Sequence, residues 1–184
     1  MENLDLILPE IFLSLSIFAT LLIGVFFKNS YNLVTNTTYV IIISLLLIIF
    51  NSFNDSGNLF SNSFVSNSFT NFFKILILLG TLFVMLITQD FIKEMKINCF
   101  EYPLLLLFSV LGMFFMISSN DLMSFYLGLE LQSLALYILA SIDRDNLKSN
   151  ESGIKYFVLS ALSSGLLLYG CSLLYGFTGS TNFE

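Results

Sequence analysis

The chain has 184 residues, of which 56% are hydrophobic and 11% are charged, and its mean hydropathy is +0.86. Soluble domains carry about 25% charged residues, so this chain cannot cover a water-soluble globule and is expected to be an integral membrane protein. The net charge of −6 forms no basic patch, which argues against a nucleic-acid partner. Without histidine, and with only Cys99 and Cys171 far apart in sequence, no metal or cofactor site is expected on this chain.

The N-terminal segment MENLDLILPE is acidic. It lacks the basic region of a signal peptide and the Arg- and Ser-rich character of a transit peptide. We therefore expect the first hydrophobic segment to remain in the mature protein. The abundance of Phe, Ile and Asn, with few basic residues, is typical of an A/T-rich, organelle-type coding bias.

Apolar runs near the length of about 20 residues that crosses a bilayer recur along the chain. They predict an all-α, polytopic membrane protein of about six transmembrane helices: Leu6–Phe27, Thr35–Phe53, Phe72–Phe91, Tyr102–Ser118, Leu122–Ser141 and Gly153–Tyr175. Pro9 and Pro103 fall in first turns, where a missing N–H costs little. We divide the chain into residues 1–101, with the first three helices, and residues 102–184, with the last three.

Two of the predicted links have distinct characters. Residues 51–71 are rich in Asn, Ser and Phe, and they predict a polar loop at the membrane interface whose phenylalanines dip into lipid. The link SSND at 118–121 is short, so the fourth and fifth helices should pack antiparallel as a hairpin.

The basic residues predict the orientation of the chain in the membrane. Those in the first, third and fifth links share one side, whereas Lys74 lies alone, at the edge of the third helix, on the other side. By the positive-inside rule the N-terminus faces outside, and an even number of helices places the C-terminus there too. The basic side carries Lys28, Lys93, Lys96, Arg144 and Lys148, and the opposite side carries Glu2, Asp5, Asp55, Asp121 and Glu184.

Glu130 is the most informative residue of the chain, because no other charge lies between Asp121 and Asp143. A carboxylate at mid-membrane depth costs about 2.5–3.5 kcal/mol on insertion scales. Leu would pack as well without that desolvation cost. The position therefore indicates a proton relay, an ion site or a counter-charge for a substrate.

Tyr126, Glu130, Ser133 and Tyr137 recur at spacings that place them on one face of the fifth helix. This polar stripe, with Glu130 at its centre, could hold water or a partner side chain. An alternative is that Glu130 only makes a hydrogen bond between helices. Asn or Gln would serve that purpose without an ionisable proton.

Lys155 is predicted two residues inside the sixth helix, on the basic side. Helical rise places Lys155 about 3 Å and Glu130 about 15 Å from that membrane face. Snorkelling to the headgroups and service as a proton way-station remain alternatives of similar weight for Lys155. Ser160 and Ser164 either allow tight helix packing or line a hydrated path. Glu10 and Asp121 are interpreted as interfacial partners of helix dipoles.

Three segments carry a resemblance to a known family: LPEIF at 8–12, MFFMISSNDLMSFYLGLELQSLALYILA at 113–140, and GIKYFVLSALSSGLLLYGCSLLYGFTGSTNF at 153–183. They resemble the chain 2 family of respiratory NADH:ubiquinone oxidoreductase (complex I), and the mitochondrial forms of plants and protists look most similar. The resemblance spans most of the chain and is weakest over residues 28–71.

The resemblance implies an antiporter-like subunit of the membrane arm, which moves protons and carries no cofactor of its own. FMN, iron–sulfur clusters and ubiquinone would lie on other subunits of an NADH-oxidising complex. The implied location is the mitochondrial inner membrane, with the N-terminus in the intermembrane space. The implied partners are the other membrane-arm subunits and lipids such as cardiolipin.

Two residues match the family's pattern. Glu130 matches a glutamate on the fifth helix that pairs, in the family, with a lysine on the seventh helix. Lys155 matches a lysine at the start of the sixth helix. This chain ends after the sixth helix, so we expect a split gene, in which a second polypeptide supplies the later helices and their lysine.

The sequence thus favours a non-redox, proton-translocating subunit of complex I, with Glu130 and Lys155 on its proton axis. Two alternatives stay open. One is a subunit of a multi-subunit cation/proton antiporter, whose members share the glutamate helix. The other is a structural remnant that has lost pumping.

Overall fold

The computed structural model describes residues 4–27, 30–94 and 99–183. A 3-10 helix, η1 (Leu4–Ile7), leads into α1 (Leu8–Phe26), α2 (Ser30–Asn51), strands β1 (Gly57–Leu59) and β2 (Phe64–Ser66), α3 (Ser68–Glu94), α4 (Glu101–Ser118), α5 (Leu122–Ala140) and α6 (Leu147–Thr178). Within these ranges, six helices are long and apolar enough to cross a membrane, which confirms the predicted fold class. Of the charges used to predict orientation, Glu2, Lys28, Lys96 and Glu184 lie outside the described residues.

The helices extend beyond their apolar runs, because polar residues cap them further out. At the start of α6, the Asn146 side chain accepts a hydrogen bond from the backbone N of Lys148. At the start of α3, the backbone N of Asn67 donates to Thr70 Oγ1 over 2.9 Å. Capping side chains satisfy the free N–H groups of a first turn. Apolarity therefore located the membrane crossings, and the caps set the helix ends.

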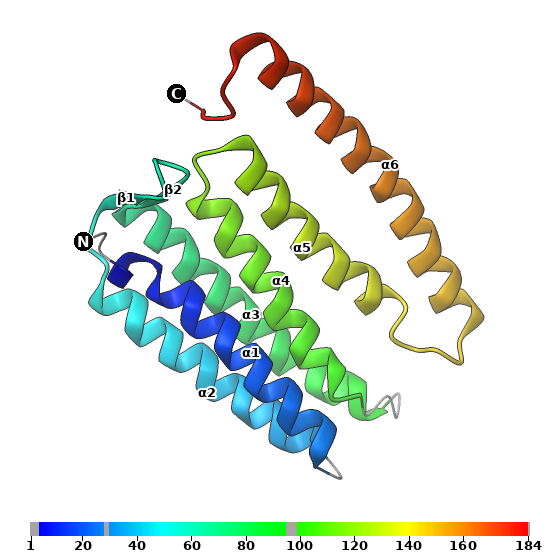
Figure 1. Ribbon diagram of the computed structural model, residues 1–184. Coiled ribbons are helices and arrows are strands. Elements are labelled where there is room, and N and C mark those ends of the chain that lie inside the picture. The colour runs from blue at the N-terminus through cyan, green and yellow to red at the C-terminus, as the bar shows by residue number, and fades with distance from the viewer. Residues whose placement is uncertain (1–3, 28–29, 95–98, 184) are drawn as a thin grey trace.

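Helices α1 to α4 form one bundle, with α5 alongside α4 and α6 outermost (Figure 1). The buried core lies inside that bundle, where aliphatic side chains of α1, α2, α3 and α4 interdigitate. Its fully buried members include Leu13, Ile17, Leu45, Leu78 and Phe114. By contrast, α6 exposes most of its apolar side chains, as expected of a helix that faces lipid or further protein.

Helices α4 and α5 pack more closely than any other described pair, which confirms the predicted antiparallel hairpin. The contact is made at Gly112 and Gly128, where the two backbones approach each other directly. A Cβ added to Gly112 would lie 2.6 Å from the backbone N of Gln132 and 2.7 Å from the backbone O of Gly128. Glycine is required there because any side chain would separate the helices.

The segment between α2 and α3 was predicted to be an interfacial loop. The structure shows that it contains an antiparallel hairpin of β1 and β2. Leu59 pairs with Phe64, and both are buried against Leu6 instead of dipping into lipid. Two other phenylalanines of the predicted loop are exposed: Phe60, in the turn, with a positive φ of 51°, and Phe69, in the first turn of α3. Alternation along the short strands buries one face, a signal that the Asn- and Ser-rich composition concealed.

Three segments meet at the hairpin end of the bundle and are joined by backbone hydrogen bonds (Figure 1). The N–H of Asn120, in the α4–α5 link, donates to the carbonyl of Ser63 over 2.9 Å. The N–H of Leu122 donates to the carbonyl of Thr181, in the segment that follows α6, also over 2.9 Å. We call these three segments, residues 57–66, 119–121 and 180–183, the end cap. The hydrogen bonds of the end cap confirm that its three segments share one side of the bundle. Which side of the membrane the end cap faces stays a prediction.

Candidate functional site: buried charges in the apolar bundle

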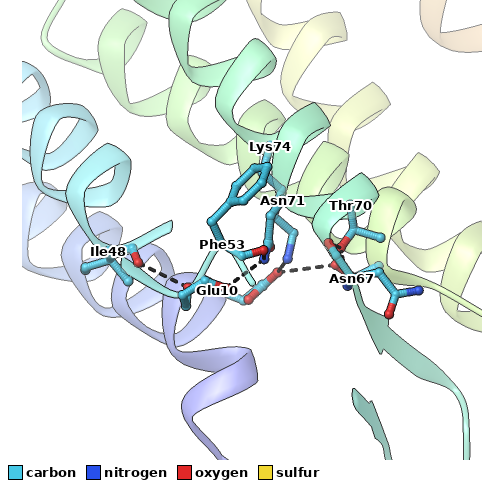
Figure 2. Close-up of polar contacts among 9 residues, drawn as sticks. Glu10, Ile48, Phe53, Asn67, Thr70, Asn71 and Lys74 are labelled. Carbon is cyan, nitrogen blue, oxygen red and sulfur yellow. Dashed lines mark hydrogen bonds and ion pairs between the residues drawn. The ribbon is translucent and has the colours of Figure 1, made fainter. Parts of the chain in front are cut away.

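The first charged site joins α1 to α3. Glu10 lies in the first turn of α1, and Lys74 lies in the second turn of α3. Lys74 Nζ is 2.6 Å from Glu10 Oε1, and the exposed fractions of the two side chains are 0% and 1%. Figure 2 shows the two side chains directed toward one another inside the bundle. This is a buried ion pair at membrane depth, the kind of group that is costly unless paired.

The pair lies among few polar and several aromatic groups. Ser118, the last residue of α4, directs its hydroxyl at Glu10 Oε1 from 3.5 Å. Lys74 Nζ is 5.5 Å from the ring centroid of Phe64 and 5.8 Å from that of Phe114. Both distances are within the range of cation–π attraction. Glu10 Oε2 is buried and accepts no hydrogen bond within the described residues, so the carboxylate is only half satisfied.

Local sequence explains why the two charges meet. Pro9 occupies the first turn of α1, where its fixed φ favours helix initiation directly before Glu10. In α3, Asn71 lies three residues before Lys74, and its side-chain amide donates to the backbone O of Ser52 over 3.0 Å (Figure 2). That bond joins the start of α3 to the end of α2. The helix starts therefore place both charges at the same end of the bundle.

The interpretation of Glu10 as an interfacial partner of a helix dipole was wrong, because the side chain is buried and paired. The placement of Lys74 at the edge of its helix was wrong too, because α3 begins at Ser68 and not at Phe72. A sequence signal was present. Two opposite charges interrupt two apolar runs near the same predicted membrane face, where each would be costly alone.

The second charged site is Glu130, in the middle of α5. Its side chain is half-buried, and its Oε1 atom is buried without a hydrogen-bond partner in the described part of the chain. Gly128 and Gln132 face α4. Since each helical residue turns by about 100°, Glu130 lies about 200° around α5 from Gly128 and points away from α4. Its carboxylate therefore faces the side of α5 that the four-helix bundle does not fill.

The remaining stripe residues have mixed outcomes. Tyr137 donates from its hydroxyl to Ser160 of α6, so the structure brings these two together. Ser133 donates to the backbone O of Glu130 over 3.0 Å, within one helical turn. Tyr126 is half-buried. On α6, Ser164 donates to the backbone O of Ala161, a hydrogen bond within its own helix.

The structure does not bring Lys155 to Glu130. Lys155 forms an exposed ion pair with Glu151, one turn earlier on α6. The sequence predicted Lys155 near the start of the sixth helix. Because α6 begins at Leu147, Lys155 instead lies in its third turn. Between α5 and α6 lie two apolar grooves, of about 650 Å³ near the end cap and about 560 Å³ near the opposite end. The α5–α6 interface is therefore only partly filled by this chain.

Cys99 is the one cysteine outside the membrane-spanning segments, and it lies half-buried just before α4. Partial burial raises the pKa of its thiol, and the carboxylates of Glu101 and Asp143 act in the same direction against Arg144. The described residues hold no group of three or more His, Cys, Asp or Glu side chains that could bind a metal ion.

The fold and the two charged sites define a class: polytopic membrane proteins with ionisable side chains inside an apolar helix bundle. The family described as "NADH:quinone oxidoreductase/Mrp antiporter, TM" matches residues 119–184, which include α5 with Glu130 and all of α6. NADH-quinone oxidoreductase subunit N of Pelagibacter ubique is 59% identical over all of this chain. The subunit N proteins of Bartonella bacilliformis and, as subunit N 1, Rhizobium meliloti are 51% and 46% identical over 99% of it.

This chain is therefore similar in sequence to subunit N proteins of bacterial NADH-quinone oxidoreductases. The chain spans 39%, 37% and 38% of the length of those three relatives. Among solved structures, respiratory complex I from Thermus thermophilus matches with a TM-score of 0.81 and 27% identity, over 96% of this chain and 38% of that one. An archaeal membrane-bound sulfane sulfur reductase, with a TM-score of 0.83 and 20% identity, shares the fold.

Proposed function

We propose that this chain is part of the proton-translocating membrane arm of an NADH-quinone oxidoreductase, and that Glu130 is one of its proton carriers. One observation supports this assignment above the others. In a homologue of subunit N, Glu130 lies at the middle of a membrane helix with a buried carboxylate oxygen that has no partner among the described residues. Ionisable side chains inside membrane helices commonly belong to proton relays or ion sites.

Proton loading at Glu130 would follow the charge of a neighbouring cation. A positive charge nearby favours the carboxylate, and withdrawal of that charge favours the protonated acid. The carboxylate lies on the side of α5 that faces away from α4, and Tyr137, on the same stripe, lines the groove between α5 and α6 at the end opposite the end cap. We propose that a lysine on a further helix docks there, because the relatives are more than twice as long as this chain. That helix belongs to a second polypeptide under the split-gene hypothesis.

Lys155 would exchange protons between water and the membrane interior. Its ammonium group and the carboxylate of its partner Glu151 are both exposed, so both are accessible to water. Tyr137, two helical turns after Glu130 on α5, donates a hydrogen bond to Ser160 of α6. This pair of hydroxyls would carry protons between α6 and the polar stripe of α5. Water in the α5–α6 groove would complete the route.

The other implied features follow from membership of such a complex. The redox cofactors, FMN and iron–sulfur clusters, and the quinone would lie on other subunits. Neighbouring membrane-arm subunits and lipids such as cardiolipin would cover the exposed apolar faces. We keep the mitochondrial inner membrane, with the N-terminus outside, as the proposed location. The named relatives come from bacteria, so fractionation of the source cells decides between organelle and bacterial membrane.

The test replaces Glu130 with Gln in the assembled complex, with Glu130→Asp as the matched control that keeps the carboxyl group. We expect Glu130→Gln to lower the number of protons translocated per NADH oxidised in reconstituted vesicles, while the complex still assembles. The Asp variant should retain part of that coupling. Loss of the whole complex on native gels would make Glu130 structural, and full coupling in the Gln variant would remove it from the proton path.

A cation/proton antiporter is the second candidate, because the matched family description includes Mrp antiporters. The names of the relatives favour the oxidoreductase. Sodium-dependent transport by a purified complex without NADH dehydrogenase activity would reverse that preference.

A further inference from the structure

We propose that Glu10 and Lys74 form a second proton-holding site, separate from Glu130, at the end-cap side of the bundle. This inference rests on the proposed function, because it adds a site to the same proton-translocating machine. The site would hold one extra proton on Glu10, giving a carboxylic acid beside the Lys74 ammonium. Release of that proton would restore the ion pair, so that one proton enters and one leaves in each cycle.

The first argument is the incomplete satisfaction of the pair. Glu10 Oε1 forms the ion pair with Lys74 Nζ and accepts a hydrogen bond from the Ser118 hydroxyl, whereas Glu10 Oε2 is buried with no hydrogen-bond partner in the described residues. A buried ion pair that served packing alone would be expected to have its free lone pairs satisfied. The vacant Oε2 is therefore the atom on which an added proton would reside.

The second argument is that Lys74 has stabilising neighbours other than Glu10. The ring of Phe64, from β2, and the ring of Phe114, from α4, both lie within 6 Å of its ammonium nitrogen. When Glu10 is protonated, the lysine keeps these two aromatic faces as partners for its charge. The loaded state would thus be tolerated where an ammonium in purely aliphatic surroundings would not be.

The third argument is position. Glu10 lies in the first turn of α1, and Phe64, part of the buried cluster with Leu6 and Leu59, lies beside its partner Lys74 on the end-cap side. The hairpin that supplies Leu59 and Phe64 is a short element whose displacement would open the pair to water. At this end of the bundle, the Ser118 hydroxyl lies 3.5 Å from Glu10 Oε1, and Lys74 Nζ lies 5.5 Å from the ring centroid of Phe64. Exchange with water would therefore take place at this end.

The test exploits a difference between a structural ion pair and a proton-holding one. Three variants of the assembled complex are compared: Glu10→Gln, Lys74→Met, and the double variant Glu10→Gln/Lys74→Met. Lys74→Met leaves a buried carboxylate without its partner, so this variant would assemble poorly for structural reasons alone. Glu10→Gln instead resembles the protonated state, in which Lys74 keeps the rings of Phe64 and Phe114 as partners. The double variant removes both charges and relieves that defect. Assembly on native gels and protons translocated per NADH oxidised are measured for each.

We expect the double variant to assemble and to oxidise NADH, with a loss of protons translocated per NADH. Recovery of both assembly and full coupling in the double variant would overturn the inference, because it would show a purely structural pair. Failure of the double variant to assemble would overturn it as well, since the charges would then be required for folding. The Glu130→Gln variant is measured in parallel. A coupling defect there, with full coupling in the double variant, removes the second site and leaves the proposed function intact.

Discussion

Three acidic residues of this chain have similar sequence contexts, in or beside apolar helices, but the structure places their side chains in three different environments. Glu10 is buried and paired with Lys74, and Glu130 is half-buried, with an Oε1 atom that has no hydrogen-bond partner in the described part of the chain. Asp121 caps the N-terminus of α5, where it accepts from the backbone N of Met123 over 2.7 Å. The cap agrees with the interpretation of Asp121 as a helix-terminal partner. The chemical type of a residue thus did not determine its role, and its neighbours from other helices did.

Replacement of Asp121 tests this cap. Asp121→Ala should destabilise the start of α5 by about 0.5–2 kcal/mol, the usual cost of a lost N-cap. The variant also loses the bond that Thr181 donates to the second carboxylate oxygen over 2.9 Å. The measurement is the thermal midpoint of the purified complex in detergent. Asp121→Asn is the control, because its amide oxygen still caps the helix, and an equal loss in both variants would contradict a capping role.

At the scale of helices and strands, close contacts between backbones position the proton-carrying helix. The α4–α5 contact at Gly112 and Gly128 fixes the rotation of α5, and that rotation directs Glu130 away from α4. Gly153, in the first turns of α6, approaches the side chain of Ser141 and the backbone O of Tyr137. The small residues of α5 and α6 therefore set the direction of the functional side chains as well as the spacing of the helices.

A methyl group at the α4–α5 contact should disrupt it. Gly112→Ala would place a Cβ against backbone atoms of Gln132 and Gly128, which cannot move aside as a side chain can. Overpacking of this kind costs about 1–3 kcal/mol. We expect a lower thermal midpoint together with weaker proton coupling, because α5 must shift or rotate.

Gly80→Ala in α3 is the matched control for Gly112→Ala. A Cβ at Gly80 meets no atom within 4 Å, so this variant should be neutral or slightly stabilising. If Gly112→Ala behaved like Gly80→Ala, the α4–α5 contact would not determine the position of Glu130.

At the scale of the whole molecule, apolarity predicted the number, order and approximate bounds of the helices, and the short SSND link predicted the α4–α5 hairpin. These features depend on local composition and length. The Glu10–Lys74 pair depends on two residues that are far apart in sequence, and the hairpin of β1 and β2 lies in a segment whose composition is typical of a loop. The sixth helix was predicted to start at Gly153, where the apolar run begins, but α6 starts at Leu147 because Asn146 caps it. The position of Lys155 within the helix was therefore wrong.

Thiol labelling tests the predicted orientation of the whole chain. Cys99 lies on the side assigned to the basic links, so a membrane-impermeant maleimide should reach it only from the inner face of oriented vesicles. Cys171 is buried within α6 and should label much more slowly. Labelling of Cys99 from the outer face would reverse the orientation.

The pH dependence of the same reaction checks the surroundings of Cys99. The thiolate is the reactive form, so a raised pKa makes labelling slow at neutral pH and faster as the pH rises through the raised value. Glu101→Gln removes a carboxylate that raises this pKa and should speed labelling at neutral pH. An unchanged rate would show that the Glu101 carboxylate does not act on the Cys99 thiol.

The end cap has a consequence for how this protein tolerates change in its loops. Its segments are joined mainly through main-chain N–H and C=O groups, as between Asn120 and Ser63 and between Leu122 and Thr181. Such bonds are indifferent to which side chain is present but depend on the spacing of the peptide groups. Substitutions at exposed positions of the cap should therefore be accepted, whereas insertion or deletion of a single residue would shift the register of three loops together. An affinity tag placed within the cap would consequently be a poor choice for purifying the intact complex.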